Sequence, residues 1–252
     1  MADLNSPRQN HLLDALPVAE YERLFPHLEP VLMPLGEVLY ESGDELHYIY
    51  FPATCIVSML YVMQNGASAE IAMIGNEGIV GAAVFMGGGT MPHRAVVQSE
   101  GYAFRMRRHQ FLQAFNRYGG RRSGALHHLL LHYIQALMTQ MAMTGVCNQH
   151  HSLGQRLCRC LLLSLDRISG NELTLTQELI ANLLGVRREG VTEAAGKLQK
   201  AGLICYCRGH ITVLDRAGLE ARVCECYQVI KAENARLLPP PPEVTYWHRA
   251  CD

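Results

Sequence analysis

Cysteine and histidine side chains are the most conspicuous reactive groups of this chain. Its nine cysteines include three Cys-x-Cys pairs: Cys158/Cys160, Cys205/Cys207 and Cys224/Cys226. Cys205 and Cys207 would share one face of a strand, where they could bind a metal ion or oxidise together. The other two pairs fall in expected helices, where residues two apart diverge. Because an unpaired cysteine packs as a small apolar residue, we expect buried, reduced thiols at all three pairs.

Five histidines lie in or beside one uncharged segment: His127, His128, His132, His150 and His151. The four-residue spacing of His128 and His132 puts two imidazoles on one helical face, as haem or a metal would require. No third ligand is evident at a matching spacing, so we favour a polar flank of a helix. We therefore predict no metal, no cofactor and no catalytic residue. A haem, metal or redox sensor, or a His/Cys-based enzyme, stays open as the alternative.

A second group of side chains has the chemistry to read nucleic-acid bases. Arg187, Arg188 and Glu189 follow Gly185 directly. An arginine can pair in bidentate fashion with guanine O6 and N7, while a glutamate accepts a hydrogen bond from cytosine N4. Arg188 beside Glu189 therefore suits a DNA site that contains G·C pairs.

Two short helices joined at Gly185 would position these charges. Thr176 is a suitable N-cap of the first helix, and a glycine can end that helix at positive φ. The apolar face of this helix would be Leu179, Ile180, Leu183 and Leu184, and the second helix, Arg187 to Lys200, would bury Val191, Ala195 and Leu198. Residues 203–207 and 210–213, around Arg208-Gly209, predict a β-hairpin wing.

A helix-turn-helix followed by a wing indicates a DNA-binding module, with a solvated helical hairpin as the alternative. The expected DNA contacts are Thr176, Arg187, Arg188, Glu189, Thr192, Glu193, Lys197 and Arg208. Arg188 and Glu189 would supply specificity in the major groove. Lys197, Lys200 and Arg208 would contact phosphates and make binding depend on salt.

Residues 125–150 contain no Asp, Glu, Lys or Arg and show a helical apolar stripe: Leu126, Leu130, Tyr133, Leu137, Met141 and Thr144. The intervals of three and four residues predict one long helix. Because its flanks lack charge, we expect it to be covered on more than one side, with this stripe as a dimer seam. An ordinary core helix inside one chain is the alternative, since periodicity alone does not separate the two.

The front half reads as an all-β unit with a helical lead-in over residues 12–28. Between about Leu32 and Met106, short runs rich in β-branched and aromatic residues alternate with glycines. Residues 1–104 hold 3 basic and 12 acidic residues, a net charge of −9, whereas residues 151–222 hold 10 basic and 7 acidic residues, a net charge of +3. A basic back half is compatible with binding to nucleic acid.

With these motifs the chain resembles the Crp/Fnr family of transcription regulators, over roughly residues 30 to 225. The similar segments are 35–44, 48–51, 74–81 and 185–191, and Arg188 and Glu189 stand where the family places its base-reading Arg and Glu. The resemblance implies an α+β fold with an N-terminal, jelly-roll-like β-roll of the cyclic-nucleotide-binding type, a long dimerisation helix and a C-terminal winged helix-turn-helix. The expected ranges are 1–106, 107–148, 149–225, and 226–252 for a helix end and a Pro-rich tail that starts at Pro239–Pro242.

The effector pocket implied by the resemblance comprises Gly81, Ala82, Ala83, His93 and Arg94. Members that bind cyclic AMP carry Gly-Glu and Arg-Ser at this pocket. Ala82 has no acceptor for a ribose hydroxyl, and a neutral His93 is a poor phosphate clamp. We therefore expect another ligand, or none, instead of cyclic AMP. Gly87-Gly88-Gly89 lacks the Lys-Ser/Thr of a phosphate-binding loop and is interpreted as a flexible pocket flap.

The expected partners are double-stranded DNA and a second copy of the chain. In such a homodimer, two recognition helices about 34 Å apart would bind a pseudo-palindromic site. The resemblance implies activation by contact with RNA polymerase, and repression by occlusion is equally compatible; the small-molecule effector is unknown. No cysteine precedes Cys55, which argues against the N-terminal iron–sulfur cluster of the family's oxygen-sensing branch. An odd number of cysteines, no export signal and a long helix too polar to span a bilayer favour the cytoplasm.

Overall fold

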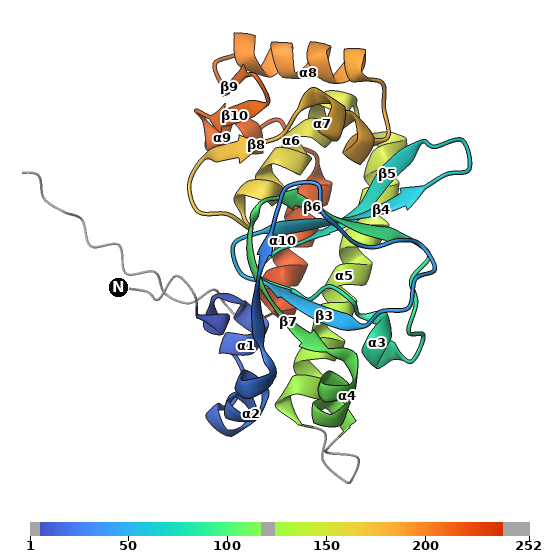
Figure 1. Ribbon diagram of the computed structural model, residues 1–252. Coiled ribbons are helices and arrows are strands. Elements are labelled where there is room, and N and C mark those ends of the chain that lie inside the picture. Colours follow the sequence, from blue (N-terminus) through green and yellow to red (C-terminus); the bar gives the residue numbers. More distant parts are fainter. Residues whose placement is uncertain (1–5, 117–123, 239–252) are drawn as a thin grey trace, which may run out of the picture.

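The computed structural model describes residues 6–116 and 124–238, which form an N-terminal β domain, a long helix and a C-terminal mixed domain (Figure 1). The expected Pro-rich segment 239–242 lies outside the described residues. Within the described residues, no helix combines the length and the apolar character needed to cross a membrane.

The helical lead-in is a set of short pieces, η1 Pro7–Gln9, α1 His11–Asp14, α2 Val18–Leu24 and η2 Phe25–His27. Pro17 lies between α1 and α2. It is the N-cap of α2, and its backbone, at φ −52° and ψ 142°, is not helical. The buried Asn10 fixes this lead-in to the β domain: its side-chain amide donates to the carbonyls of Pro52, at 3.0 Å, and Gly78, at 2.8 Å.

Two antiparallel sheets form the β-roll. Its strands are β1 Glu29–Met33, β2 Val38–Tyr40, β3 Tyr48–Pro52, β4 Ile56–Val62, β5 Ser68–Ile74, β6 Arg94–Ser99 and β7 Gly101–Arg107. Their order is β1-β7-β3 in one sheet and β2-β6-β4-β5 in the other. Both sheets contribute to one core, which includes Phe51 and Phe104 from the first sheet and Met59 and Val97 from the second. The expected strands beginning at Val38, Tyr48 and Ile56 are confirmed.

The remaining helices of the front half are α3 Ala83–Met86 and α4 Arg108–Asn116, and the long helix α5 spans Ala125–His150. Tyr133 on α5 is fully enclosed by the β-roll, and its hydroxyl donates to the Ile79 carbonyl at 2.8 Å. Gly78 lies flat against this ring, since a Cβ there would be 2.5 Å from Tyr133 Cε2. The ring therefore fixes α5 against the β-roll.

The apolar stripe expected to be the dimer seam instead faces the chain's own β-roll. Leu126, Leu130, Tyr133, Leu137 and Thr144 are buried within the chain, and Met141 packs against the same core. In this fold a second chain does not reach the five buried side chains. A helix without charges can be covered on more than one side, so its most regular apolar stripe need not be the outer one.

A different face of α5 is open to solvent. It comprises Leu131, Gln135, Met138, Ala142, Gly145 and Gln149, at intervals of four and three residues, with Val146 beside them. Leu131, Met138 and Val146 are 52%, 65% and 44% exposed. The face is free of charge, and its small residues Ala142 and Gly145 leave room for close approach of another helix.

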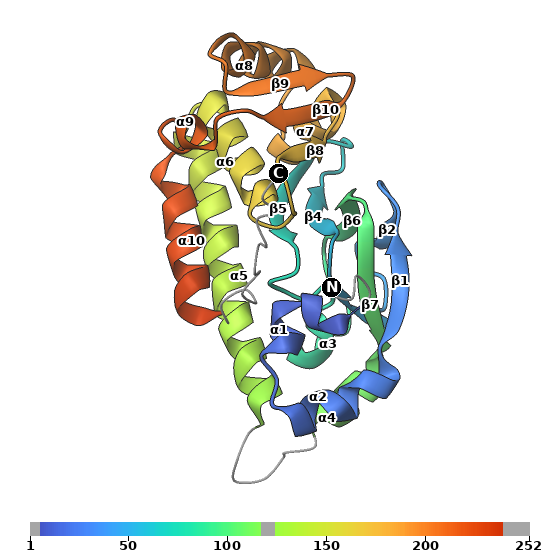
Figure 2. The same cartoon turned by 90° about the vertical axis from the view of Figure 1, so that its left-hand side faces the viewer.

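The C-terminal domain comprises α6 Leu153–Leu165, β8 Glu172–Thr174, α7 Gln177–Leu184, α8 Arg188–Lys200, β9 Ile204–Cys207, β10 His210–Val213 and α9 Arg216–Glu220. Its last helix, α10 Glu225–Leu237, runs back beside α5 (Figure 2). The domain's own core joins residues of α6, α7, α8 and the small sheet with Ile56, Leu60 and Met73 of the β-roll. The two domains therefore share a continuous apolar contact.

A buried polar cluster crosses this contact. The Arg167 guanidinium lies 2.7 Å from Glu77 Oε1 and donates to Gln140 Oε1 at 3.0 Å and to the Leu163 carbonyl at 2.8 Å. Gln140 in turn donates to the Met73 carbonyl at 2.9 Å. The side chains of Arg167 and Glu77 are only 4% and 16% exposed. One guanidinium thus joins the β-roll, α5 and the segment after α6.

Replacing Arg167 by Ala should lower the free energy of unfolding by about 3–5 kcal/mol, because the Glu77 carboxylate would be left buried without its counter-charge. Equilibrium unfolding in urea measures this loss. Arg105→Ala removes a more exposed ion pair with Glu29 and should cost about 1 kcal/mol or less. Similar losses in the two variants would show that the Arg167 pair has no special weight.

Candidate functional site

The helix-turn-helix forms where the sequence predicts it, through local capping. Thr176 is the N-cap of α7, and its hydroxyl accepts from the Leu179 N–H at 3.1 Å. Gly185 ends α7 in the left-handed region at φ 62° and ψ 41°. Val186 packs against the core of the domain, and α8 begins at Arg188, one residue later than expected, with Arg187 as its extended N-cap.

The second helix of this motif, α8, is the recognition helix of the proposed DNA interface, and it lies at the outer edge of the C-terminal domain (Figure 1). Its inner face is Val191, Ala194, Ala195 and Leu198, all buried. The expected contact residues Thr176, Arg187, Arg188, Glu189, Thr192, Glu193, Lys197 and Arg208 are all exposed, as is Lys200. Packing of one face therefore turns the charged face of α8 outward.

Three side chains on this surface have partners within the chain. The Thr192 hydroxyl lies 2.8 Å from Gln177 Oε1, which ties α8 to α7. Glu193 and Lys197 form an i,i+4 ion pair at 2.7 Å, with both side chains about seven-tenths exposed. An exposed pair of this kind is weak, so each charge is available to another partner at low cost. Arg188 and Glu189 stand beside this pair in the first turn of α8.

The wing follows α8 as expected, and the structure adds a third strand. Strands β9 and β10 pair in antiparallel register, with β8 on the far side of β10. Arg208 and Gly209 form the turn at φ 49° and 84°, which displays the Arg208 side chain at its tip. The Tyr206 hydroxyl donates to the Leu175 carbonyl at 2.8 Å and anchors the wing to the segment before α7.

The expectation of buried thiols is wrong for the pair on the wing. Cys205 and Cys207 share the outer face of β9 and are exposed, because β9 is an edge strand whose other face covers the domain core. Cys158 and Cys160 are buried in α6, as expected.

The tip of the β4–β5 hairpin reaches the turn of the helix-turn-helix. A Cβ at Gly185 would lie 3.2 Å from the Ala69 Cβ, and the Ser68 hydroxyl is 3.5 Å from the Asn182 carbonyl. Glycine at position 185 thus allows both the positive φ and the close approach of Ala69 to the backbone. The contact connects the β-roll physically with the base of the recognition helix.

The candidate effector residues already have partners inside the β-roll. Gly81, at φ 101°, precedes the buried Ala82 and Ala83 at the start of α3. His93 is 2% exposed, and its Nε2 lies 3.0 Å from the Tyr40 hydroxyl. Arg94 Nη2 donates to Glu41 Oε1 at 2.9 Å. In this state Arg94 is committed to an ion pair and His93 to a buried hydrogen bond.

The Gly87–Gly89 segment is an ordered turn in this structure, contrary to the expected flap. Gly87 ends α3 in the left-handed region, and the N–H groups of Gly88 and Gly89 donate to the Ala83 carbonyl. The Gly89 carbonyl accepts from the Leu46 N–H at 2.9 Å. These bonds hold the three glycines against neighbouring backbone.

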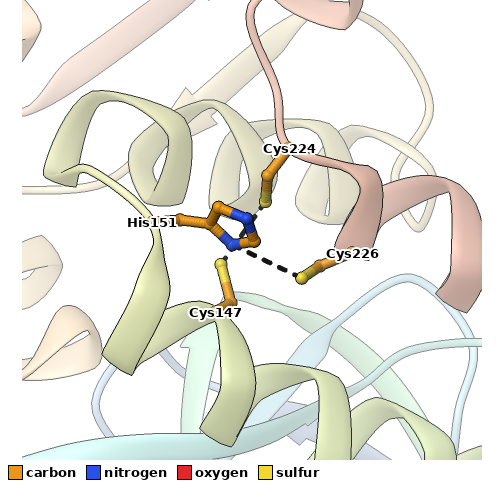
Figure 3. Close-up of side chains that lie close together, drawn as sticks. All are labelled: Cys147, His151, Cys224 and Cys226. Atoms are coloured by element: carbon orange, nitrogen blue, oxygen red, sulfur yellow. Dashed lines mark hydrogen bonds between the residues drawn. The ribbon is translucent and has the colours of Figure 1, made fainter.

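The structure also brings together four residues that the sequence analysis kept apart: Cys147, His151, Cys224 and Cys226 (Figure 3). From the sequence, Cys224 was expected inside a helix, where it would diverge from Cys226. In fact α10 begins at Glu225, and Cys224 is its extended N-cap. A helix start at this position was the signal that the sequence analysis missed.

The buried His93 predicts a pH dependence of stability. Burial lowers its pKa from the ordinary 6.5 to about 4. Between these pH values the unfolded chain binds a proton at His93 that the folded chain does not. The contribution of His93 to the free energy of unfolding is therefore complete above pH 6.5 and is lost as the pH falls toward 4. His93→Gln should reduce the loss of stability between pH 7 and 4.5 by about 2 kcal/mol in urea unfolding. The exposed His109→Gln is the control, and equal pH slopes for wild type and H93Q would contradict the assignment.

Two family models match the chain: a cyclic nucleotide-binding domain over residues 31–118 and a Crp-like helix-turn-helix domain over residues 155–222. No curated protein sequence matches it. Among solved structures, a Crp/Fnr-family transcriptional regulator from Eubacterium rectale is 17% identical, with a TM-score of 0.64 over 85% of this chain and 98% of that one.

FixK2 from Bradyrhizobium japonicum is 16% identical, with a TM-score of 0.64 over 78% of this chain and 98% of its own. The c-di-GMP-responsive regulator CLP of Xanthomonas campestris is 16% identical, with a TM-score of 0.61 over 78% and 99%. These likenesses confirm the α+β fold, with its β-roll, long helix and winged helix-turn-helix. The two matched domains, which together cover more than half of the chain, show that it belongs to the Crp/Fnr family, whose members are transcription regulators and not enzymes.

Proposed function

We propose that this Crp/Fnr-type regulator binds a pseudo-palindromic DNA site as a homodimer, with the first turn of α8 in the major groove of each half-site. The exposed Arg188–Glu189 pair at the start of α8 is the observation that carries the proposal. The buried inner face of α8 holds the helix in place. Arg188 and Glu189 are therefore already exposed on a formed helix before DNA binds.

Specificity and affinity would come from different residues. Arg188 has the donors for guanine O6 and N7, and Glu189 has the acceptors for cytosine N4. Lys197, Lys200 and the wing-tip Arg208 would neutralise phosphates on either side. Thr176, Arg187, Thr192 and Glu193 complete the exposed surface and would position the protein on the duplex. Action on DNA agrees with the expected cytoplasmic location.

The dimer would form through the outer face of α5, defined above by Leu131, Met138 and their neighbours. This face has no charged residue over most of the helix and mixes apolar side chains with Gln135, which donates to Glu233 of α10, and Gln149. Its four–three spacing is that of a coiled-coil seam. The buried stripe of Leu130 and Tyr133 would support the helix from behind. Two-fold pairing of α5 would place two recognition helices about 34 Å apart, one turn of B-DNA.

Control by a ligand other than cyclic AMP, or by no ligand, fits the β-roll best. Ala82 offers no side-chain acceptor, and the low pKa of buried His93 leaves the imidazole neutral at pH 7. Arg94 would have to leave Glu41 to bind an anion. The haem-sensor alternative has little support at His128 and His132, which are exposed on α5 and face away from the β-roll core. Contact with RNA polymerase would make the protein an activator, and occlusion of a promoter would make it a repressor.

Arg188→Ala should weaken binding to the specific site by about 1–3 kcal/mol, roughly 5- to 150-fold, and leave binding to random DNA nearly unchanged. The site is first selected from a random duplex library with the wild-type protein. Fluorescence anisotropy then measures both affinities over a range of salt concentrations.

Lys200→Ala is the matched comparison, and it should weaken specific and random binding alike and lower the salt slope by about 1. Arg105→Ala, on the β-roll, should change neither affinity. An equal loss on specific and random DNA in R188A would refute the base-reading role of Arg188.

Met138→Glu should raise the dimer dissociation constant by about 100-fold or more, because the seam would have to bury two carboxylates that face each other across the two-fold axis. Sedimentation equilibrium measures the constant. Val18→Glu introduces the same charge at an equally exposed apolar residue on α2, and it should leave the dimer intact. A dimer in M138E as stable as that of V18E would place the interface elsewhere.

A further inference from the structure

Cys147, His151, Cys224 and Cys226 converge at the junction between α5 and α10. Their three Sγ atoms and one imidazole nitrogen all lie within 4.8 Å of one another (Figure 3). The three cysteines are buried and His151 is half-buried. The neighbouring pairs are Cys147 Sγ to Cys224 Sγ at 3.5 Å and Cys226 Sγ to His151 Nδ1 at 3.6 Å.

These separations are close to the edges of a tetrahedral metal site. Zn–S bonds of about 2.3 Å and a Zn–N bond of about 2.05 Å give S–S edges of about 3.8 Å and S–N edges of about 3.5 Å. Since no two of these donor atoms are more than 4.8 Å apart, each pair would have to close by at most about 1 Å to reach these edges. Three thiolates and an imidazole are a donor set that selects zinc among common divalent ions.

The backbone positions the four donors in two pairs. Cys147 lies in the last turn of α5 and His151, four residues later, is its C-cap, so the two side chains lie on the same side of the helix end. Cys224 has extended backbone at φ −78° and ψ 163°, which lets its side chain meet that of Cys226 in the first turn of α10. Cys224 stands at an N-cap but makes no capping hydrogen bond. Its side chain is directed to the cluster instead.

The surroundings of the cluster suit a bound metal ion with anionic ligands. His151 Nε2 lies 3.3 Å from Glu225 Oε2, while Nδ1 faces the sulfurs, which is the usual carboxylate–histidine–metal arrangement. Two of the thiolates would sit at the N-terminus of the 13-residue α10, where the helix dipole favours negative charge. The charge of the buried Arg159 acts on Cys147, and its Nε–H has no acceptor among the described residues. One more positive charge therefore lies beside an anionic complex.

We propose that Cys147, His151, Cys224 and Cys226 bind one zinc ion in a structural, tetrahedral Cys3His site. The ligands flank the winged helix-turn-helix domain, two just before α6 and two just after α9. The ion would join the segments by which that domain leaves and rejoins α5, and would close a loop of 77 residues between Cys147 and Cys224.

Binding has a defined proton balance. Without metal, free thiols are mostly protonated at pH 7, because the ordinary pKa of a cysteine side chain is about 8.5. A divalent ion with three thiolates and neutral imidazole forms a complex of charge −1. Uptake of one ion by three thiols therefore releases three protons.

The test uses the full-length chain, stripped with a chelator under reducing conditions and then titrated with zinc chloride at pH 7. We expect one zinc per chain by elemental analysis, about three protons released per ion, a rise in Tm, and sulfur-to-metal charge-transfer bands when cobalt(II) replaces zinc. Glu225→Gln, a change at an exposed residue, should weaken zinc binding about 10- to 100-fold.

Cys226→Ser should abolish stoichiometric zinc uptake, whereas Cys158→Ser, at a buried cysteine outside the cluster, should keep it. E225Q covers the case in which C226S does not fold. Three results would each overturn the proposal: no zinc uptake by the reduced chain, the same zinc affinity in E225Q and wild type, or equal loss in C226S and C158S. A Cys147–Cys224 disulfide in place of zinc uptake would identify a redox pair instead.

Discussion

The buried Arg167–Glu77 ion pair is the constraint on which the arrangement of the two domains depends. The guanidinium is 4% exposed and meets groups from three parts of the chain, namely Glu77 after β5, Gln140 on α5 and the Leu163 carbonyl on α6. A charge this deeply buried is tolerated only when all three partners are in place. Gly75 leaves the necessary room, since a Cβ there would be 2.8 Å from Arg167 Cγ.

Further polar contacts run across the same interface. The Ser58 hydroxyl lies 2.7 Å from both Gln98 Oε1 and Glu70 Oε2, and Gln98 Nε2 donates to the Ser164 hydroxyl at 3.3 Å. Burial raises the pKa of Glu70. Such a network is stable only in one relative placement of the β-roll and α6. In any other placement, buried polar groups would lose their hydrogen-bond partners and have no water to replace them. The position of the recognition helix is thus tied to the β-roll by both apolar and polar contacts.

Helix α5 shows how one uncharged segment can have three different neighbours. One face holds Tyr133 and the β-roll core, a second lies along α10, and a third is exposed around Met138. Its C-terminal end adds Cys147 and His151 to the cysteine–histidine cluster. The helix therefore connects the proposed dimer axis, the β-roll and both ends of the winged domain.

Features that are local in the chain could be predicted from the sequence alone. The cap at Thr176, the glycine at 185, the turn at Arg208-Gly209 and the β-roll strands that begin at Val38, Tyr48 and Ile56 each depend on a few neighbouring residues, and all are where they were predicted. The outermost face of α5 could not be predicted in this way, because periodicity indicates that a helix has apolar faces but not what covers each one. Only the tertiary structure decided the meeting of Cys147 with Cys224, 77 residues away, since spacing reports only on neighbours along one element. The physical reason is the same in both cases: packing between distant segments is selected by the whole core and leaves no local pattern.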